Sequence, residues 1–170
     1  IMKIVPKLDA GPVLIQSKIK ITKEINLKEL SDKMSELGAK LILDTLKLVE
    51  NKKVNFIEQN ESEATYAKKI EKIETRINWK DDAGKILAKI NAFCPNPGCW
   101  FELDGIRMKI IKAKEIIIKG APGTILDEKL TIACFRNAIQ IIELQKEGKQ
   151  KMTTNEFLRG NKIKIGQSLN

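Results

Sequence analysis

The sequence predicts two parts of different fold class: an α/β segment, followed by a small domain built mainly from β-strands. Helical periodicity spans residues 26–52, and short apolar runs separated by Gly and Pro follow residue 99. A basic stretch at 64–79 joins the two parts. With 170 residues, of which 42% are hydrophobic, the chain is long enough to bury a core as one domain or as two small ones.

Composition limits the classes of partner. A net charge of +9 favours an anionic partner such as nucleic acid, although a lysine-rich protein without such a partner has the same balance. No run of about 18 apolar residues occurs, so we expect no membrane span. The odd set Cys94, Cys99 and Cys134 lacks any histidine, and its C-x4-C spacing fits zinc patterns poorly. We therefore expect no metal, and reduced, buried thiols in a cytoplasmic protein.

The first residues predict a hairpin-like edge. Residues 1–5 and 13–21 are rich in β-branched side chains and alternate with polar ones, which predicts two short strands. Between them, residues 7–12 carry Asp, Gly and Pro and predict a turn with Asp9 at its tip. Asp starts turns in unrelated proteins, so this residue alone does not indicate catalysis.

The clearest predicted helix runs from residue 26 to residue 52. Asn26 is a suitable N-cap, and Glu29 stands three residues later, as in a capping box. Apolar residues recur at helical spacing and predict a buried face: Leu27, Leu30, Met34, Leu37, Leu41 and Leu48. We expect this helix to be part of the core.

The basic stretch has two interpretations. It is either a solvated linker anchored by Tyr66 and Trp79, or a surface that binds phosphates. In a helical conformation, Arg76 would follow Lys72 by four residues and the two cations would share a face.

The remaining residues predict a small barrel or sandwich. Asp81 or Asp82 would cap a helix that ends at Phe93, before two prolines. Strands are expected at 100–103 and 107–118, joined by an Asp-Gly hairpin, and then at 124–126, 130–135 and 138–144. Thr153 or Thr154 would cap a short final helix.

Several motifs together resemble one known family. Ala-Thr-Tyr-Ala-x-Lys-Ile at 64–70, followed by Arg-Ile-x-Trp at 76–79, is similar to the interdomain segment of methionyl-tRNA formyltransferases. That family usually has Asp before the Trp, where this sequence has Asn78. Leu-Asp-x-Gly at 8–11, Asn-Ala-Phe-x-Pro-x-Pro-x-x-Trp at 91–100 and Ala-Pro-Gly-Thr-Ile at 121–125 resemble further blocks of the family in the same order.

The resemblance implies a domain organisation. Residues 1–60 would end a Rossmann-like catalytic domain, residues 61–80 would be a basic interdomain linker, and residues 81–170 would form an OB-like barrel that binds tRNA. It also implies formyl transfer from 10-formyltetrahydrofolate to the α-amine of initiator methionyl-tRNA, by a monomer without a membrane partner. The chain begins with Ile inside an expected strand, so we expect a fragment of a longer protein.

The resemblance also implies roles for individual residues. Asp9 would act with an Asn and a His that lie upstream of Ile1, so the chain alone is expected to be inactive. Lys7, Leu8 and Gly11 would form one wall of the folate pocket. Candidate tRNA-binding cations lie in the joint and in a later loop: Lys68, Lys69, Lys72, Arg76, Lys149 and Lys151. Lys112 and Lys114 are equally compatible with a solvated strand face.

Two alternatives stay open at this point. A related formyltransferase that acts on an amino sugar nucleotide, or one that hydrolyses formylfolate, would share the Asp turn and the Thr-Tyr joint. A non-enzymatic RNA-binding barrel with a helical prefix would explain the charge but not the Leu-Asp-x-Gly turn. An upstream Asn-x-His followed by Ser-Leu-Leu-Pro would decide for the enzyme family.

Overall fold

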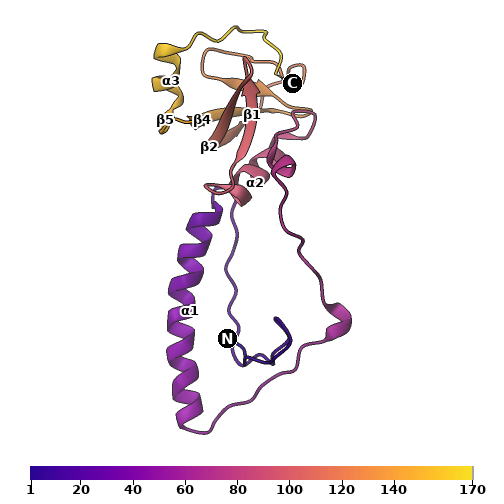
Figure 1. Cartoon of the computed structure of the whole chain (residues 1–170), viewed down its shortest axis with the longest axis vertical. Helices are drawn as coiled ribbons and strands as arrows, with labels where there is room; N and C mark the ends of the chain where they lie inside the picture. The colour runs from indigo at the N-terminus through magenta and orange to yellow at the C-terminus, as the bar shows by residue number, and fades with distance from the viewer. Residues whose placement is uncertain (170) are drawn as a thin grey trace. The chain divides into compact units, whose positions relative to one another are not determined.

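The computed structural model describes residues 1–169 and divides into two compact units (Figure 1). The first unit comprises Ile1–Thr22 and Glu29–Lys69, and the second comprises Lys23–Lys28 and the chain from Ile70 onward. The predicted domains at 1–60, 61–80 and 81–170 stay predictions, because compactness alone does not define a domain. No helix among the described residues is both long and apolar enough to cross a membrane.

The first unit contains the long helix and irregular chain. Helix α1, Leu27–Glu50, confirms the helix predicted at 26–52. The strands predicted at 1–5 and 13–21 are wrong, because only isolated bridges join Met2 to Val13 and Val13 to Ile57. Two backbone bonds, Lys3 N to Pro12 O at 2.9 Å and Leu14 N to Ile1 O at 2.9 Å, close this segment into a loop. The alternation that predicted strands therefore belongs to a paired loop.

The apolar face of α1 is only partly covered, which corrects the prediction that this helix is core. Among its described residues only Thr45 is buried, while Met34 is 57% exposed and Leu27 is 41% exposed; the other residues of the predicted face are half-buried. Periodicity predicts which face of a helix is apolar, but it does not say what covers that face. The rest of the first unit is mostly loop and supplies too few side chains to do so.

The second unit is built on one antiparallel sheet. Its strands are β1 (Cys99–Leu103), β2 (Ile106–Ile116), β3 (Thr131–Ala133), β4 (Ala138–Lys146) and β5 (Lys151–Thr153). They pair in the order β1-β2-β4-β3, and β5 also pairs with β4. The described strands form an open five-stranded sheet that does not close into a barrel, so the prediction of a small OB-like barrel is wrong for them. β1 and β3 are short, and beyond them only isolated bridges add chain to the sheet, at Trp100 and at Ile132.

Turn chemistry explains where the strands reverse. Asp104 and Gly105 have φ of 51° and 75°, as a two-residue turn with both residues left-handed requires, and this confirms the predicted hairpin. Asn137, with φ of 63°, turns β3 into β4, between the strands predicted at 130–135 and 138–144. The strand predicted at 124–126 is reduced to two isolated bridges, and β5 was not predicted.

Two helices complete the second unit. Helix α2, Ala83–Phe93, buries Ala83, Ile86 and Ile90 in the core. Helix α3, Thr154–Gly160, begins with a capping box. In this box Thr153 Oγ1 accepts from Glu156 N at 3.2 Å, and the Glu156 carboxylate accepts from Thr153 N at 2.7 Å. Both predicted helices are therefore confirmed. Side chains of α2, of α3 and of one face of the sheet together form the core of the second unit.

Candidate functional site

The first group of candidate residues lies on one turn of the first unit. Asp9 has φ of 53°, and its carboxylate is exposed, with no hydrogen-bond partner among the described residues. The Gln59 side chain donates to Asp9 O at 2.9 Å and to Gly11 O at 2.7 Å. The turn is thus held by its backbone, which leaves the Asp9 carboxylate available to another group.

The neighbours of Asp9 differ in how tightly they are held. A Cβ at Gly11 would lie 1.7 Å from Lys3 O, so only glycine fits this close backbone approach. Lys7 donates a hydrogen bond to Glu61, and this bond raises the pKa of Lys7 and lowers the pKa of Glu61. Leu8 is 86% exposed, an apolar side chain without cover in this unit.

The basic joint is extended rather than helical. Lys68 and Lys69 are exposed in irregular chain of the first unit. In the second unit, Lys72 begins a short 3-10 helix, η2 (Lys72–Thr75), and Arg76 beyond it is extended, with ψ of 134°. The expectation that Lys72 and Arg76 share an α-helical face is therefore wrong.

The second half of the joint is a structural part of the second unit. Thr75, Ile77 and Trp79 are buried, and Ile77 N donates to Trp100 O at 2.8 Å, so this segment lies along the edge of β1. Trp79 packs edge-on against Phe101 with ring centroids 5.7 Å apart, whereas Tyr66 is 88% exposed. Only one of the two predicted aromatic anchors is buried. The alternation of Thr75, Ile77 and Trp79 was the signal for a half-buried edge segment.

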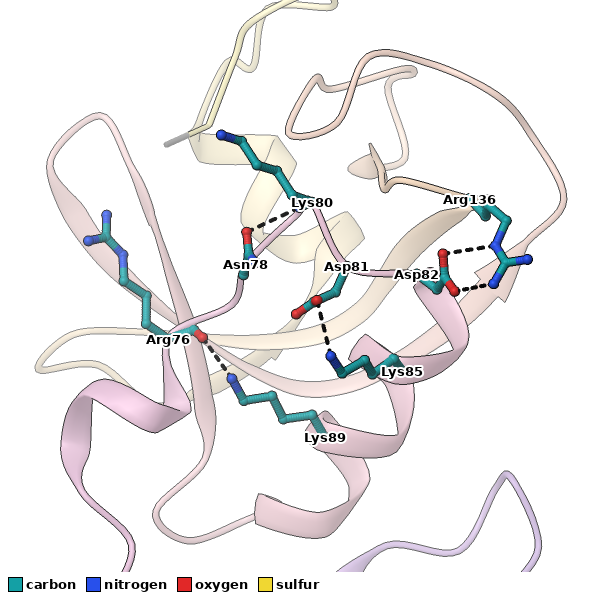
Figure 2. Close-up of polar contacts among 8 residues, drawn as sticks. All are labelled: Arg76, Asn78, Lys80, Asp81, Asp82, Lys85, Lys89 and Arg136. Carbon is teal, nitrogen blue, oxygen red and sulfur yellow. Dashed lines mark hydrogen bonds and ion pairs between the residues drawn. The ribbon is translucent and has the colours of Figure 1, made fainter.

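Asn78 closes a small turn at the end of the joint. Its Oδ1 accepts from Lys80 N at 3.2 Å, and its neighbour Asp81 pairs with Lys85 at 3.2 Å (Figure 2). An aspartate at this position would offer the same acceptor oxygen to Lys80 N. The turn therefore does not depend on which of these two side chains is present.

The start of α2 is joined to the turn between β3 and β4. Asp82 precedes the helix but makes no capping bond with it; its carboxylate instead accepts two hydrogen bonds from Arg136 (Figure 2). These bonds lower the pKa of Asp82 and raise the pKa of Arg136. The predicted capping position is correct, and the pair stabilises the packing of α2 on the sheet.

Lys149 and Lys151 lie where β4 turns into β5. Both are exposed, Lys149 in the turn after β4 and Lys151 at the start of β5. Gln145 donates to Lys149 O at 2.7 Å and lies opposite Lys151 in the strand register. Strand pairing therefore brings both lysines to one part of the second unit.

Sequence reasoning missed Arg107. Its guanidinium carbon lies 4.0 Å from the centroid of the Trp100 ring, and that of Arg76 lies 5.4 Å from the same centroid. The Asp-Gly hairpin was the available signal, because its register places Glu102 opposite Arg107 and Trp100 opposite Lys109. Arg107 is thus diagonal to Trp100 across the hairpin.

Burial makes the three thiols poor candidates for nucleophiles. All three are buried and outside any disulfide, as predicted. Burial raises the pKa of Cys99 to about 11 and that of Cys134 to about 12. No group of three or more His, Cys, Asp and Glu residues within 1–169 is arranged to hold a metal ion.

Comparison with known proteins places these features in a family. Residues 69–162, more than half of the chain, match the family described as formyl transferase, C-terminal domain. A methionyl-tRNA formyltransferase from Bradyrhizobium diazoefficiens is 40% identical over 170 residues, covering 98% of this chain and 55% of that protein. One from Pelagibacter ubique is 39% identical over 99% of this chain and 55% of that protein. The chain therefore spans about half the length of these relatives.

Solved structures show the same fold at lower identity. HypX from Aquifex aeolicus matches with a TM-score of 0.74 at 23% identity, over 95% of this chain and 30% of that chain. WlaRD, a sugar 3N-formyl transferase, matches with a TM-score of 0.62 at 18% identity, over 88% of this chain and 54% of that chain. These similarities concern the fold alone.

Proposed function

The chain belongs to the formyl transferase family through its C-terminal domain, and we propose that it forms the C-terminal part of a methionyl-tRNA formyltransferase. The observation that carries this proposal is 40% identity to such an enzyme along 98% of the chain. The reaction would transfer a formyl group from 10-formyltetrahydrofolate to the α-amine of initiator methionyl-tRNA. Activity would require the part of the relatives that this chain does not span.

The exposed surface of the first unit supports the proposal that another part of the enzyme packs on it. Several apolar residues of α1 are exposed, among them Met34 and Leu43, and Leu8 on the Asp9 turn is 86% exposed. Large exposed apolar surface on a folded protein usually contacts another part of the protein or a ligand. In this proposal the upstream half of the enzyme packs on α1 and meets the turn that carries Asp9.

The proposed role of Asp9 follows from its geometry and from the reaction. Formyl transfer to an amine passes through a tetrahedral intermediate, which needs a hydrogen-bond donor for its oxyanion and an acceptor for the amine proton. The Asp9 carboxylate is exposed and held on a fixed turn, so it can orient a histidine or accept the proton directly or through water. This chain contains no histidine, so the donor would come from the upstream half.

The folate donor would contact the same turn. Gly11 allows the close backbone approach that shapes the turn, and Lys7 and Leu8 present a cation and an apolar surface beside Asp9. A tetrahydrofolate complex is known for HypX, which shares the fold. We propose that Lys7, Leu8 and Gly11 form one wall of the folate site and that Asp9 faces the formyl group.

The tRNA would contact the cations of the joint and of the sheet. Lys68, Lys69, Lys72, Lys149 and Lys151 are all exposed, and Arg76 is partly exposed beside Trp100. Contacts between cations and phosphates release counterions, so they dominate the affinity of such complexes and make it depend on salt. The extended joint can follow an RNA backbone without a helical conformation.

A binding and turnover test with the 170-residue chain examines this proposal. Initiator methionyl-tRNA should bind, with an affinity that falls steeply as salt rises, while dTDP as a nucleotide control should bind far more weakly. Formylation with 10-formyltetrahydrofolate should be undetectable. Preference for the nucleotide, or turnover close to that of a full-length relative, would contradict the proposal.

A further inference from the structure

The indole ring of Trp100 on β1 is contacted by two guanidinium groups. The carbon of the Arg107 guanidinium lies 4.0 Å from the ring centroid, and that of Arg76 lies 5.4 Å from it. The ring itself is fixed, because Trp100 is 8% exposed and its Nε1 donates to Lys72 O at 3.4 Å. The position of the Trp100 ring is therefore fixed, and both guanidinium groups make cation–π contacts with it.

Only one of the two guanidinium groups at the Trp100 ring has a carboxylate partner within residues 1–169. Arg76 forms an ion pair with Glu102 at 3.7 Å, and its backbone carbonyl accepts from Lys89 at 3.0 Å while its side chain extends away from that bond (Figure 2). Arg107 lies opposite Glu102 in the strand register, yet its guanidinium has no hydrogen bond or ion pair within residues 1–169. Its Nε is buried and has no partner there. Glu102 therefore pairs with Arg76 and not with Arg107, and Arg107 still needs an acceptor.

We infer that Arg76, Trp100 and Arg107, which we term the arginine–tryptophan clamp, bind a phosphate group of an RNA backbone through Arg107. A guanidinium is a planar fork of donors that matches phosphate oxygens in pairs. Contact with the indole restricts the side chain before the phosphate arrives, so less conformational entropy is lost on binding. The inference rests on the proposed tRNA-binding function and adds Arg107 and Trp100 to the surface.

The strand register connects the clamp with a cation already proposed for the same partner. Trp100 lies opposite Lys109, Lys109 lies opposite Gln145, and Gln145 lies opposite Lys151. Residues directly opposite each other project from the same face of a sheet. One face therefore carries Trp100 and Arg107 of the clamp, on β1 and β2, and Lys151 on β5, in a row across four strands. A phosphate backbone that crossed the strands would meet cations at both ends of this row.

The contribution of Arg107 can be measured with three variants of the full chain. Arg107→Gln should weaken binding of initiator tRNA about tenfold at low salt, as expected when a charged hydrogen bond is removed. It should also flatten the slope of log K against log salt by roughly 0.7 to 0.9. Arg107→Lys should keep the slope but bind the tRNA with reduced affinity, because lysine keeps the positive charge and lacks the planar pair of guanidinium donors. The matched control Lys129→Gln removes an exposed charge elsewhere and should bind as wild type.

The indole N–H signals give a second measurement that does not depend on a variant. The chain has two tryptophans, so ¹H–¹⁵N spectra contain two indole signals. Addition of a short RNA hairpin should shift the Trp100 signal and leave that of the buried Trp79 unchanged. Absence of this shift, or unchanged affinity and slope in Arg107→Gln while wild type binds tRNA, would overturn the clamp and leave the proposed function intact. Failure of wild type to bind tRNA at all would instead contradict the proposed function.

Discussion

At the residue scale, buried thiols show how position controls chemistry. Cys99 and Cys134 have pKa values raised by burial to about 11 and about 12, and Cys99 Sγ also donates to Lys89 O at 3.4 Å. Alkylation requires the thiolate, so we expect iodoacetamide at pH 8 to label both residues far more slowly in the native chain than in urea. Peptide mass spectrometry over time gives both rates. Equal rates for either residue would show that its thiol is not protected.

The same thiols predict a loss of stability at alkaline pH. The folded state retains thiol protons that the unfolded chain releases above about pH 8.5, so stability is full below that pH and falls as pH rises. Urea unfolding at pH 8 and at pH 10 measures the change. Cys134→Ala should lose less stability over this interval than wild type. A variant that loses as much as wild type would assign the decline to other groups.

Asp9 is the residue whose proposed role is most specific. The relevant protein is a chimera in which the upstream part of the Bradyrhizobium diazoefficiens relative precedes Ile1 of this chain. Asp9→Asn in this chimera should lower the turnover number by about 10² to 10⁴, because an amide cannot accept the proton. The dissociation constant for tRNA should stay unchanged, since the cations lie elsewhere. Near-normal turnover would reduce Asp9 to a residue that shapes the turn.

At the element scale, local chemistry made the helices and the main hairpin predictable. The sequence signals at Thr153 and at Asp104-Gly105 depend on neighbours within a few residues, and both features form as expected. The alternation of Thr75, Ile77 and Trp79 indicates a half-buried segment, but its partner Trp100 is distant in the sequence and periodicity could not identify that partner. The same limit explains why an OB-like barrel is predicted where the sheet does not close, and why the sequence does not reveal the role of Arg107.

The pair that joins α2 to the turn after β3 predicts a pH-dependent effect. Arg136 lowers the pKa of Asp82, so the pair stabilises the fold fully above the ordinary aspartate range near pH 4 and loses its effect as pH falls below that range, through the lowered pKa of Asp82. Arg136→Gln should therefore lower the unfolding midpoint in urea at pH 6, with a much smaller difference from wild type at pH 2. A difference that does not change between these pH values would show that the charge of Asp82 is not involved.

The exposed cations of the joint predict a separate effect on RNA binding. Substitution of Lys68 and Lys69 by Gln should weaken tRNA binding and flatten its salt dependence by roughly 0.7 to 0.9 for each phosphate that is no longer neutralised. Lys52→Gln with Lys53→Gln is the matched control, because these lysines are also adjacent and exposed. Fluorescence anisotropy at several salt concentrations compares both double variants. Identical slopes in the two would assign residues 68 and 69 to a solvated linker.

At the scale of the whole molecule, the two units differ in how complete they are. The second unit has a continuous core that contains residues of α2, of the sheet and of α3. The first unit instead exposes apolar residues along α1, and the chain spans only about 55% of its relatives. Under the proposed function, the second unit would hold the tRNA together with Lys68 and Lys69, while the turn at Asp9 in the first unit would contribute one wall of an active site shared with the upstream half.

The initial rate of formyl transfer by the chimera tests the central proposal most directly. With 10-formyltetrahydrofolate and initiator methionyl-tRNA, the chimera should formylate the tRNA at an initial rate comparable to that of the full-length relative. Neither the upstream part nor this chain alone should do so. A chimera that folds and binds folate but leaves methionyl-tRNA unmodified, or that formylates an amino sugar nucleotide instead, would contradict the assignment of this chain to a methionyl-tRNA formyltransferase.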